Sequence, residues 1–504
     1  MMFTATLDVL FFFMISTAVV GWLSSKIRVK NLVQYYSVIG FVSTILFFLV
    51  YDLPLVSANG FIIVKTIAPT LGTLLEVDSV SIFMISIYLL LGLFVVIYSV
   101  RYMENETGLP QYYVLIFGMI AGMVGVVSAG DFFTLFIFWE LMSITSYVLV
   151  AFRKTQKTAM EASFKYLIIS SFGAGTILFA LSLLYGATGT LNLASLSQSL
   201  LNAAPTPWLM IVFAMITVGF GIKTAIVPLH TWLPDAHSEA PSSISALLSG
   251  VLIETGLYGF CRIFIIMFSL QFRWDILIAV LAIVTMTTGN IMALLQKDLK
   301  RLLAYSSISQ IGYMLIGLAV AGTPGSSQAN IDGLTGLFMH VFNHSLMKGL
   351  AFLSAGALIY KLGSRELTNL KGVGRLMPVT SVSLSISLLA LGGVPSFSGF
   401  ISKYTLFLSA FEGGMPVLAI AGILNSGLSM AYYLRVIQTI FLAKPEKDIS
   451  RIKEVPPSML MVLIAMAALI TIFGLWPGPL FEFSQNAAGS LLQIGEYVRR
   501  IIPL

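Results

Sequence analysis

The sequence predicts an all-α polytopic membrane protein with about 14 transmembrane helices. Hydrophobic residues make up 58% of its 504 residues and charged residues 10%, whereas soluble proteins carry roughly 45–50% apolar and 25% charged residues. The apolar segments are long and continuous, as in 79–100 and 132–152. A helix needs about 20 apolar residues to cross a bilayer, whereas a β-strand needs only about 10 alternating ones, so these segments are predicted to be helices.

Loops of charged and turn-forming residues separate the spans. The segment 52–78 is too polar for a span and is predicted to be an extracytoplasmic hairpin loop, and 188–206 a polar loop or short amphipathic segment. The N-terminus lacks a basic region and a cleavage site, so we expect it to begin the first retained span rather than a signal peptide. The predicted spans are 5–23, 33–51, 79–100, 112–129, 132–152, 161–187, 207–230, 241–267, 274–296, 301–322, 331–359, 378–409, 415–441 and 456–481.

Lysine and arginine gather in alternate loops. With the N-terminus outside, the loops assigned to the cytoplasm carry 19 of the 28 basic residues and the opposite side carries five. Basic loops stay on the cytoplasmic side of a membrane. Orientation therefore explains the net charge of +6 better than a nucleic-acid partner does. We expect a multi-pass protein of the cell (inner or plasma) membrane, with both termini on the extracytoplasmic side.

Prolines interrupt the seventh and the twelfth predicted span, at Pro228 and at Pro395. Each span is the fourth helix of a five-helix set, and an odd number of helices inverts the second set. Discontinuous helices at matching positions are typical of inverted-repeat transporters, although prolines also kink helices for packing alone. The chain is divided accordingly into helices 1–3 with the hairpin (1–111), a first repeat (112–267), a second repeat (274–441) and a C-terminal helix (442–504).

Three ionisable residues fall inside predicted spans of the first repeat: Glu140, Lys223 and Glu254. Such groups cost about 2.5–3.5 kcal/mol each on insertion scales and mark functional sites by default. Burial disfavours their charged forms, so each is a candidate to load and release a proton. The alternatives are a purely structural ion pair between Glu140 and Lys223, and a Glu254 that only neutralises the lysine.

The second repeat carries His340, His344 and Lys348, which recur every four residues, and Lys403. The first three lie on nearly one helix face and cover about 12 Å along its axis. Because histidine titrates near physiological pH, such a stack suits proton hopping through interposed waters. The alternatives are polar packing or a two-histidine metal site for the stack, and a snorkelling side chain for Lys403. No carboxylate or cysteine joins the histidine spacing, which disfavours a metal.

Several kinds of chemistry are excluded by what the sequence lacks. The single cysteine, Cys261, rules out a disulfide framework and any cluster or zinc site held by cysteines of this chain. A Walker A motif, a dinucleotide fingerprint and a nucleophile elbow are absent, so we expect no cofactor and no redox chemistry in this chain. The polar segment 230–239 contains His230, Asp235, His237 and Glu239 and suggests a proton entrance or a subunit contact.

Several motifs resemble one family. They are Gly221-Ile222-Lys223-Thr224-Ala225-Ile226-Val227-Pro228-Leu229-His230-Thr231-Trp232-Leu233-Pro234-Asp235-Ala236-His237, Phe138-Trp139-Glu140-Leu141, Lys300-Arg301-Leu302-Leu303-Ala304-Tyr305-Ser306-Ser307-Ile308, Asn343-His344-Ser345-Leu346-Met347-Lys348, Gly393-Val394-Pro395 and Gly399-Phe400-Ile401-Ser402-Lys403. The chain thereby resembles the antiporter-like membrane subunits, which include the D and A subunits of Mrp cation/proton antiporters, the proton-pumping subunits of respiratory complex I and related subunits of membrane-bound hydrogenases and formate hydrogenlyases. The first of these motifs is highly specific.

The resemblance implies a fold of 14 helices with inverted five-helix repeats and broken helices 7 and 12, and a proton relay along its centre. By motif position the relay residues are Glu140, Lys223, His340, His344, Lys348 and Lys403. The chain ends soon after its last span, as D-type subunits do. Glu254 departs from the family, which usually has a lysine or histidine there. It either carries the proton itself or helps to bind a sodium ion with Thr255.

The function expected from this resemblance is proton translocation within a multisubunit ion-pumping complex. Two classes stay open, a redox-driven pump of the complex I or hydrogenase type and a secondary antiporter that exchanges sodium for protons. The partners would be other membrane subunits, with a second antiporter-like subunit among the candidates, and no nucleic acid. A non-transporting scaffold is disfavoured, because a scaffold need not bury five or more titratable groups.

Overall fold

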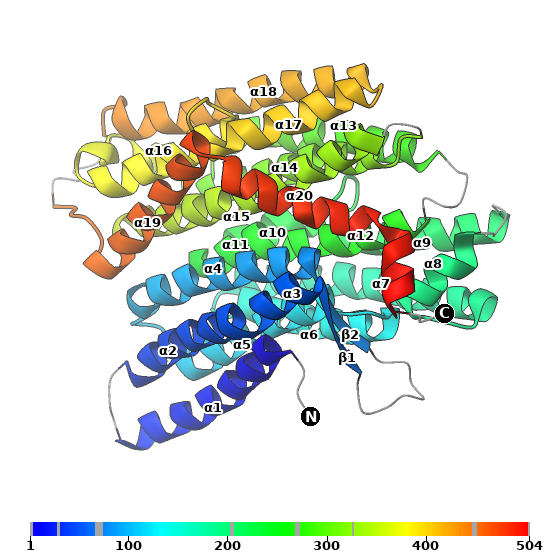
Figure 1. The fold of residues 1–504 in the computed structure, drawn as a ribbon. Coiled ribbons are helices and arrows are strands. Elements are labelled where there is room, and N and C mark those ends of the chain that lie inside the picture. The colour runs from blue at the N-terminus through cyan, green and yellow to red at the C-terminus, as the bar shows by residue number, and fades with distance from the viewer. Residues whose placement is uncertain are drawn as a thin grey trace.

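The chain folds into a bundle of helices that run side by side, with one β-hairpin at its end (Figure 1). The structure is a computed structural model and describes residues 4–27, 31–65, 74–201, 206–267, 273–324, 327–445 and 451–501. Its elements are α1 (Ala5–Ile27), α2 (Leu32–Phe47), η1 (Phe48–Asp52), α3 (Leu53–Asn59), β1 (Phe61–Lys65), β2 (Leu74–Asp78), α4 (Ser79–Tyr102), α5 (Leu109–Val127), α6 (Phe132–Val150), α7 (Lys157–Thr188), α8 (Leu193–Leu201), α9 (Pro207–Lys223), α10 (Trp232–Glu239), α11 (Ser242–Leu247), η3 (Leu248–Leu252), α12 (Ile253–Met267), α13 (Trp274–Leu294), α14 (Leu299–Ala321), α15 (Ser327–Leu362), η4 (Leu367–Leu370), η5 (Val373–Arg375), α16 (Pro378–Gly392), α17 (Ser398–Glu412), α18 (Pro416–Phe441), α19 (Pro457–Leu475), α20 (Gly478–Leu492) and α21 (Ile494–Ile501).

The helices confirm the all-α membrane fold. Within the described residues, 12 helices are long and apolar enough to cross a membrane, or 13 if the bent pair Leu367–Arg375 and Pro378–Gly392 is one span. Helix α9 has 17 residues, and α16 and α17 have 15 each. A helix of 15 residues rises only about 22 Å, too little for a hydrocarbon core of about 30 Å. The total of 14 spans and the inverted repeats stay predictions, as do the domain boundaries drawn from them.

The centre of the bundle is formed by α11, η3 and α12 together with α14 and α15. The apolar stretches of Ser242–Ile266 and Leu299–Ala321 are buried throughout, whereas α1, α7 and α13 are buried over only 33–39% of theirs. The outer helices thus offer apolar faces to lipid, and the central ones hold polar side chains away from it.

Both predicted interruptions are present. Helix α9 ends at Lys223 and α10 begins only at Trp232, with Ala225 in the left-handed region at φ 57°. Helix α16 ends at Gly392, and α17 begins at Ser398 after Gly393 at φ 83°. Glycine adopts this conformation without strain, which suits Gly393 to end the helix. Each break leaves backbone carbonyls without a helical partner inside the bundle.

The segment 52–78 contains the predicted hairpin, but its first eight residues are helical. Strands β1 and β2 pair antiparallel, with Phe61 opposite Asp78. Helix α3 starts with Pro54 in its first turn, where proline needs no hydrogen-bond donor, so the proline does not end the helix. The Asp52 carboxylate, which lies ahead of it, accepts from the backbone N–H groups of Ala5 and Thr6 and so caps α1.

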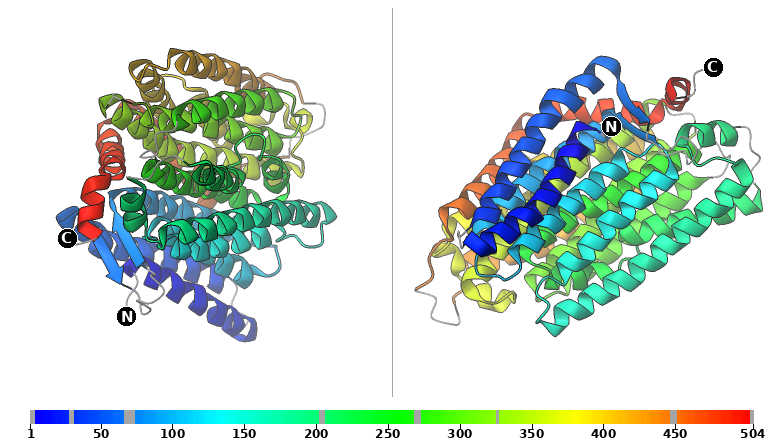
Figure 2. Two further views of the ribbon diagram at one scale, coloured as in Figure 1. Left: turned by 90° about the vertical axis from the view of Figure 1, so that its right-hand side faces the viewer. Right: turned by 90° about the horizontal axis from the view of Figure 1, so that it is seen from below.

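The two ends of the bundle differ in charge. Figures 1 and 2 place the start of α1, the hairpin and α21 at one end, which we call the terminal end. The basic loops lie at the opposite end, the basic end. Lys300, expected in such a loop, is instead buried at the start of α14. Ion pairs at the basic end include Arg153–Glu106, Lys165–Asp235, Arg301–Asp235, Arg365–Glu239 and Arg365–Asp298.

Candidate functional site

A line of buried titratable side chains crosses the centre of the bundle. It contains all seven residues singled out from the sequence, on five helices. Six of them are 0–2% exposed, and Glu140 is half-buried. We call the seven the axis residues, and in order along the chain they are Glu140, Lys223, Glu254, His340, His344, Lys348 and Lys403.

Lys223 occupies the last turn of α9, directly before the break. Its ammonium group donates to the hydroxyls of Ser143 and Tyr166, each at 2.9 Å. It also lies 5.0 Å from the centre of the Tyr166 ring and 5.9 Å from that of Trp139. The unpaired carbonyls at a helix C-terminus stabilise a cation. The pocket therefore accepts a protonated lysine without an ion-pair partner in contact.

Glu140 and Lys223, for which a structural ion pair was the alternative to a role in transport, are not in direct contact. Among the residues that the structure describes, Glu140 has no ion pair within 4.0 Å, and its buried Oε1 has no hydrogen-bond partner. The two groups still interact electrostatically over a longer distance. Glu140 instead faces a groove of about 1140 Å³ between α5, α6 and α7, together with Tyr147 and Arg153. A lysine that already has two hydroxyl acceptors gains less from a direct carboxylate contact.

Glu254 and His344 form the direct contact at the centre. The Oε1 atom of Glu254 lies 2.6 Å from Nδ1 of His344, and both side chains are completely buried. Within the described part of the chain, Oε2 of Glu254 and Nε2 of His344 have no hydrogen-bond partner. Such a short contact needs one proton between the two groups. The pair can thus share one proton, and the second polar atom of each group is open to a further donor or acceptor.

His340 continues the line toward the second break. Its Nδ1 lies 2.9 Å from Oγ of Ser402, and its Nε2 lies 2.8 Å from Oε1 of Gln310. The rings of His340 and His344 are 6.3 Å apart between centroids and nearly parallel.

Lys403 ends the line at the break between α16 and α17. Its ammonium group donates to the carbonyl of Leu391 at 2.8 Å and to the hydroxyl of Ser426 at 3.0 Å. Gln310 donates to the same carbonyl at 3.3 Å. The broken helix therefore supplies an acceptor that joins Lys403 to Gln310 and, through it, to His340.

Lys348 points toward α14 instead of along this line. Its ammonium group donates to the carbonyl of Leu303 at 2.8 Å and to the hydroxyl of Ser306. All three members of the predicted stack face the interior of the bundle, since each is 0% exposed. Lys348 extends the line toward the basic end of the bundle.

Sequence reasoning did not place three further buried polar residues beside the axis. Lys300 donates to the carbonyl of Ala240. His237 stacks on Phe352 with ring centroids 5.0 Å apart, and neither of its ring nitrogens has a hydrogen-bond partner among the described residues. The third is Gln310. Lys300 and His237 lie within the family motifs, which were the sequence signal that could have identified them. The only sequence signal for Gln310 is its position four residues after Ser306, on the same face of α14.

Metal binding finds no support. Among the described residues, no group of three or more His, Cys, Asp or Glu side chains is arranged to hold a metal ion. Thr255, proposed as a sodium ligand beside Glu254, is bonded to the hydroxyl of Tyr88 and the carbonyl of Val251. The threonine is the donor in these contacts, so its oxygen lone pairs stay available and the sodium alternative is not decided by them.

Comparisons with known proteins identify the family of the chain. Residues 129–429 match the family model described as "NADH:quinone oxidoreductase/Mrp antiporter, TM", and residues 68–113 match "NADH-Ubiquinone oxidoreductase (complex I), chain 5 N-terminus". The chain is 34% identical over 469 residues to F(420)H(2) dehydrogenase subunit N of Methanosarcina mazei, covering 91% of this chain and 92% of that protein.

It is 33% identical to NADH-quinone oxidoreductase subunit N of Desulforamulus reducens, covering 84% of this chain and 87% of that one. Its fold is similar to a chain of the membrane-bound sulfane sulfur reductase, an archaeal respiratory membrane complex, with a TM-score of 0.87, 27% identity and coverage of 98% and 99%. The chain therefore belongs to the antiporter-like membrane subunits of the NADH:quinone oxidoreductase/Mrp antiporter family.

Proposed function

We propose that this chain is a proton-translocating subunit of a redox-driven membrane complex and that protons move along the axis residues. The observation that carries the proposal is the gathering of seven titratable side chains between the two helix breaks and beside them, with Glu254 and His344 in direct contact. Isolated ionisable groups in a membrane interior are costly. A set of them in one bundle, six buried and hydrogen-bonded to polar neighbours, is explained by proton transfer.

The first half of the line would work by coupling Lys223 to Glu140. Ionised Glu140 favours the protonated lysine, and neutral Glu140 disfavours it. Because Glu140 faces a groove at the outside of the bundle, a change in that groove alters the charge state of Lys223. We infer that another membrane subunit of the complex covers this groove, and a second antiporter-like subunit is the first candidate.

The central pair would pass the proton between the two halves. The carboxyl of Glu254 and the imidazole of His344 share one proton, and Nε2 of His344 is open to the next acceptor. The line then leads through His340 and Gln310 to Lys403. Glu254 thus takes the place of the basic residue that the family usually has, with His344 supplying the base.

Protons would enter from the basic end and leave at Lys403. His237 interacts electrostatically with Lys300 and with Lys348, so these three connect the basic end to the axis. Lys403 lines a cavity of about 450 Å³ between α17 and α18. From the split of basic residues we infer that the basic end is cytoplasmic and the membrane is the cell membrane.

A redox-driven pump is favoured over a secondary antiporter by the names of the relatives. The two curated relatives are described as subunits of a dehydrogenase and of a quinone oxidoreductase. The matching family model also names Mrp antiporters. The short contact of Glu254 with His344, which needs a proton between the two groups, supports a proton over a sodium ion at Glu254.

The test is proton transport by the purified complex in liposomes. We expect Lys223→Ala to lower transport by about tenfold or more with assembly intact, because the axis loses a titratable group. Lys157→Ala, which removes an exposed lysine at the start of α7, should transport like the parent. Normal transport by Lys223→Ala contradicts the proposal. Transport that needs a sodium gradient and no electron donor would favour the secondary antiporter.

A further inference from the structure

A buried acidic cluster at the terminal end is not used by the axis residues. We propose that Glu76 is a proton-exchange group at this end of the membrane, connected to solvent by a cavity beside α20 and to Glu254 by a polar seam between α4 and α12. The proposal rests on the proposed function, since it gives the axis a second opening. The cluster consists of Glu76, Asp78, Arg262 and Tyr497.

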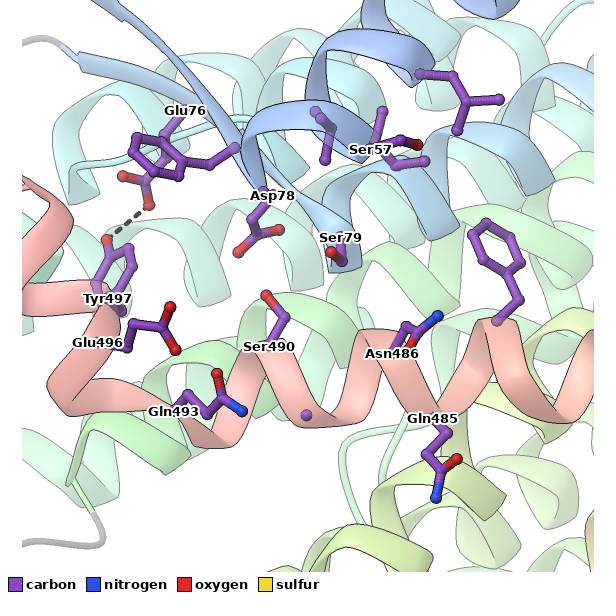
Figure 3. Close-up of a pocket in the computed structure, with 17 residues that line it drawn as sticks. Ser57, Glu76, Asp78, Ser79, Gln485, Asn486, Ser490, Gln493, Glu496 and Tyr497 are labelled. Carbon is purple, nitrogen blue, oxygen red and sulfur yellow. Dashed lines mark hydrogen bonds between the residues drawn. The ribbon is translucent and has the colours of Figure 1, made fainter.

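The cavity has a volume of about 520 Å³ and lies between the end of the hairpin, α3, α20 and α21. Figure 3 shows Glu76 and Asp78 on β2 and Glu496 on α21 around this cavity, with Ser490 on α20 and Gln493 directly after its end. A water takes up about 30 Å³ of liquid, so the cavity has room for several. Its polar lining gives such waters hydrogen-bond partners.

Charges in the cluster do not balance. Arg262 donates to Oδ2 of Asp78 at 2.7 Å and to Oε1 of Glu76 at 3.1 Å. Two buried carboxylates thus face one guanidinium group, and Glu496, on α21, lines the same cavity. Tyr258 and Tyr497 are the other titratable groups that face Glu76. One proton on a carboxyl group removes the excess charge from a site where burial makes it costly.

Glu76 is the carboxyl that takes this proton. Asp78 accepts three stabilising contacts, from Arg262 and from the N–H and hydroxyl of Ser81, and its pKa is lowered mainly by Arg262 against the cost of burial. Glu76 is 3% exposed, and its Oε2 has no hydrogen-bond partner among the described residues. Burial raises the pKa of Glu76 to about 7, although Arg262 opposes this. The group therefore changes charge near neutral pH.

Hydroxyl groups of α4 and α12 lie between this cluster and the axis, and waters would complete the seam between them. The hydroxyl of Ser81 lies 2.9 Å from Asp78 and 2.6 Å from the carbonyl of Val127, which also accepts from Tyr258 at 3.1 Å. One turn earlier on α12, Thr255 donates to the hydroxyl of Tyr88 at 2.8 Å. Tyr88 interacts electrostatically with both Tyr258 and Glu254.

The transfer involves only protons. A proton leaves the carboxylic acid of Glu254, each hydroxyl or water of the seam receives one proton and passes on another, and the carboxylate of Glu76 receives the last. Arg262 and Asp78 keep their charges throughout. Eight residues separate Glu254 from Arg262 on α12, so the seam covers about 12 Å along the membrane normal.

The first test is infrared difference spectroscopy of the purified complex between pH 6 and pH 8. We expect a protonated-carboxyl band that is half-titrated near pH 7, that disappears in Glu76→Gln and that persists in Glu482→Gln. Glutamine keeps the size of the side chain and an acceptor for Tyr497 and Arg262, so the cluster should stay folded. Glu482 carries an exposed carboxylate on α20, the helix beside the cavity, and serves as the matched control. Identical spectra for Glu76→Gln and the parent would overturn the proposal.

The second test is proton transport by the same variants in liposomes. Glu76→Gln should transport several-fold more slowly than the parent and lose its pH dependence around pH 7, whereas Glu482→Gln should behave like the parent. Lys223→Ala in parallel separates the two hypotheses. If Lys223→Ala abolishes transport and Glu76→Gln transports normally, the terminal-end site is wrong and the proposed function stands. If Lys223→Ala transports normally, the proposed function fails. The infrared spectra then test by themselves whether Glu76 gains and loses a proton near pH 7.

Discussion

The contact between Glu254 and His344 is the closest approach of two titratable groups on the axis, at 2.6 Å. A buried carboxylate beside a buried imidazole needs a shared proton, because separate charges without partners are costly in a low-dielectric interior. This explains how the chain can use a glutamate where the family resemblance implies a base. The base is supplied by His344, on the neighbouring helix α15.

Replacing Glu254 tests this pair. Glu254→Gln keeps a hydrogen-bond partner for His344 but cannot ionise, so we expect normal assembly and proton transport lowered by about tenfold or more. Glu254→Lys brings a cation against His344 and should reduce the amount of assembled complex as well. Transport and assembly are measured on the same membranes. Parental transport by Glu254→Gln would show that the carboxyl takes no part.

Individual residues show where sequence reasoning succeeded and where it failed. Charged residues inside apolar segments can be recognised from the sequence alone, because the membrane interior makes them exceptional. Whether Glu140 contacts Lys223 cannot be predicted from the sequence, because the neutral hydroxyls of Ser143 and Tyr166 compete as acceptors for the lysine. The burial of Lys300 depends on the carbonyl of Ala240, which is distant in sequence, and so the sequence wrongly predicts a loop position for this lysine.

At the scale of elements, the two helix breaks determine where the axis ends. Prolines and glycines predict both interruptions, since proline removes a backbone donor wherever it stands. The use of the freed carbonyl of Leu391 by both Lys403 and Gln310 depends on how three helices pack and has no sequence signal. The hairpin is predicted from polarity, but the helical continuation to Asn59 is not.

Close packing of α5 against α6 holds Glu140 in place. A Cβ at Gly122 would meet the backbone nitrogen of Met142 at 2.6 Å, which forces the two helices apart. We expect Gly122→Ala to destabilise the protein by about 1–3 kcal/mol, measured by thermal unfolding of the purified complex. Gly175→Ala on α7 has open space around it and is the matched control. Equal stability of the two variants would contradict this packing.

At the scale of the whole molecule, the uneven charge of the two ends sets the expected orientation. Cysteines placed singly at Thr368 and Ser199, both exposed and at the basic and terminal ends, should report it after the buried Cys261 is replaced. In intact cells a membrane-impermeant maleimide should label Ser199→Cys but not Thr368→Cys. The reverse labelling pattern would place the basic loops outside and contradict the inferred orientation.

The central claim is that the axis residues form one proton path. Groups that act in one path are not additive, because a path already broken loses nothing more at a second break. The most direct measurement is therefore the number of protons moved per turnover by the complex in liposomes with Lys223→Ala, with Glu254→Gln and with both. We predict that each single variant lowers this number to the same value and that the double variant lowers it no further. Losses that add in the double variant would show two independent paths and contradict the claim.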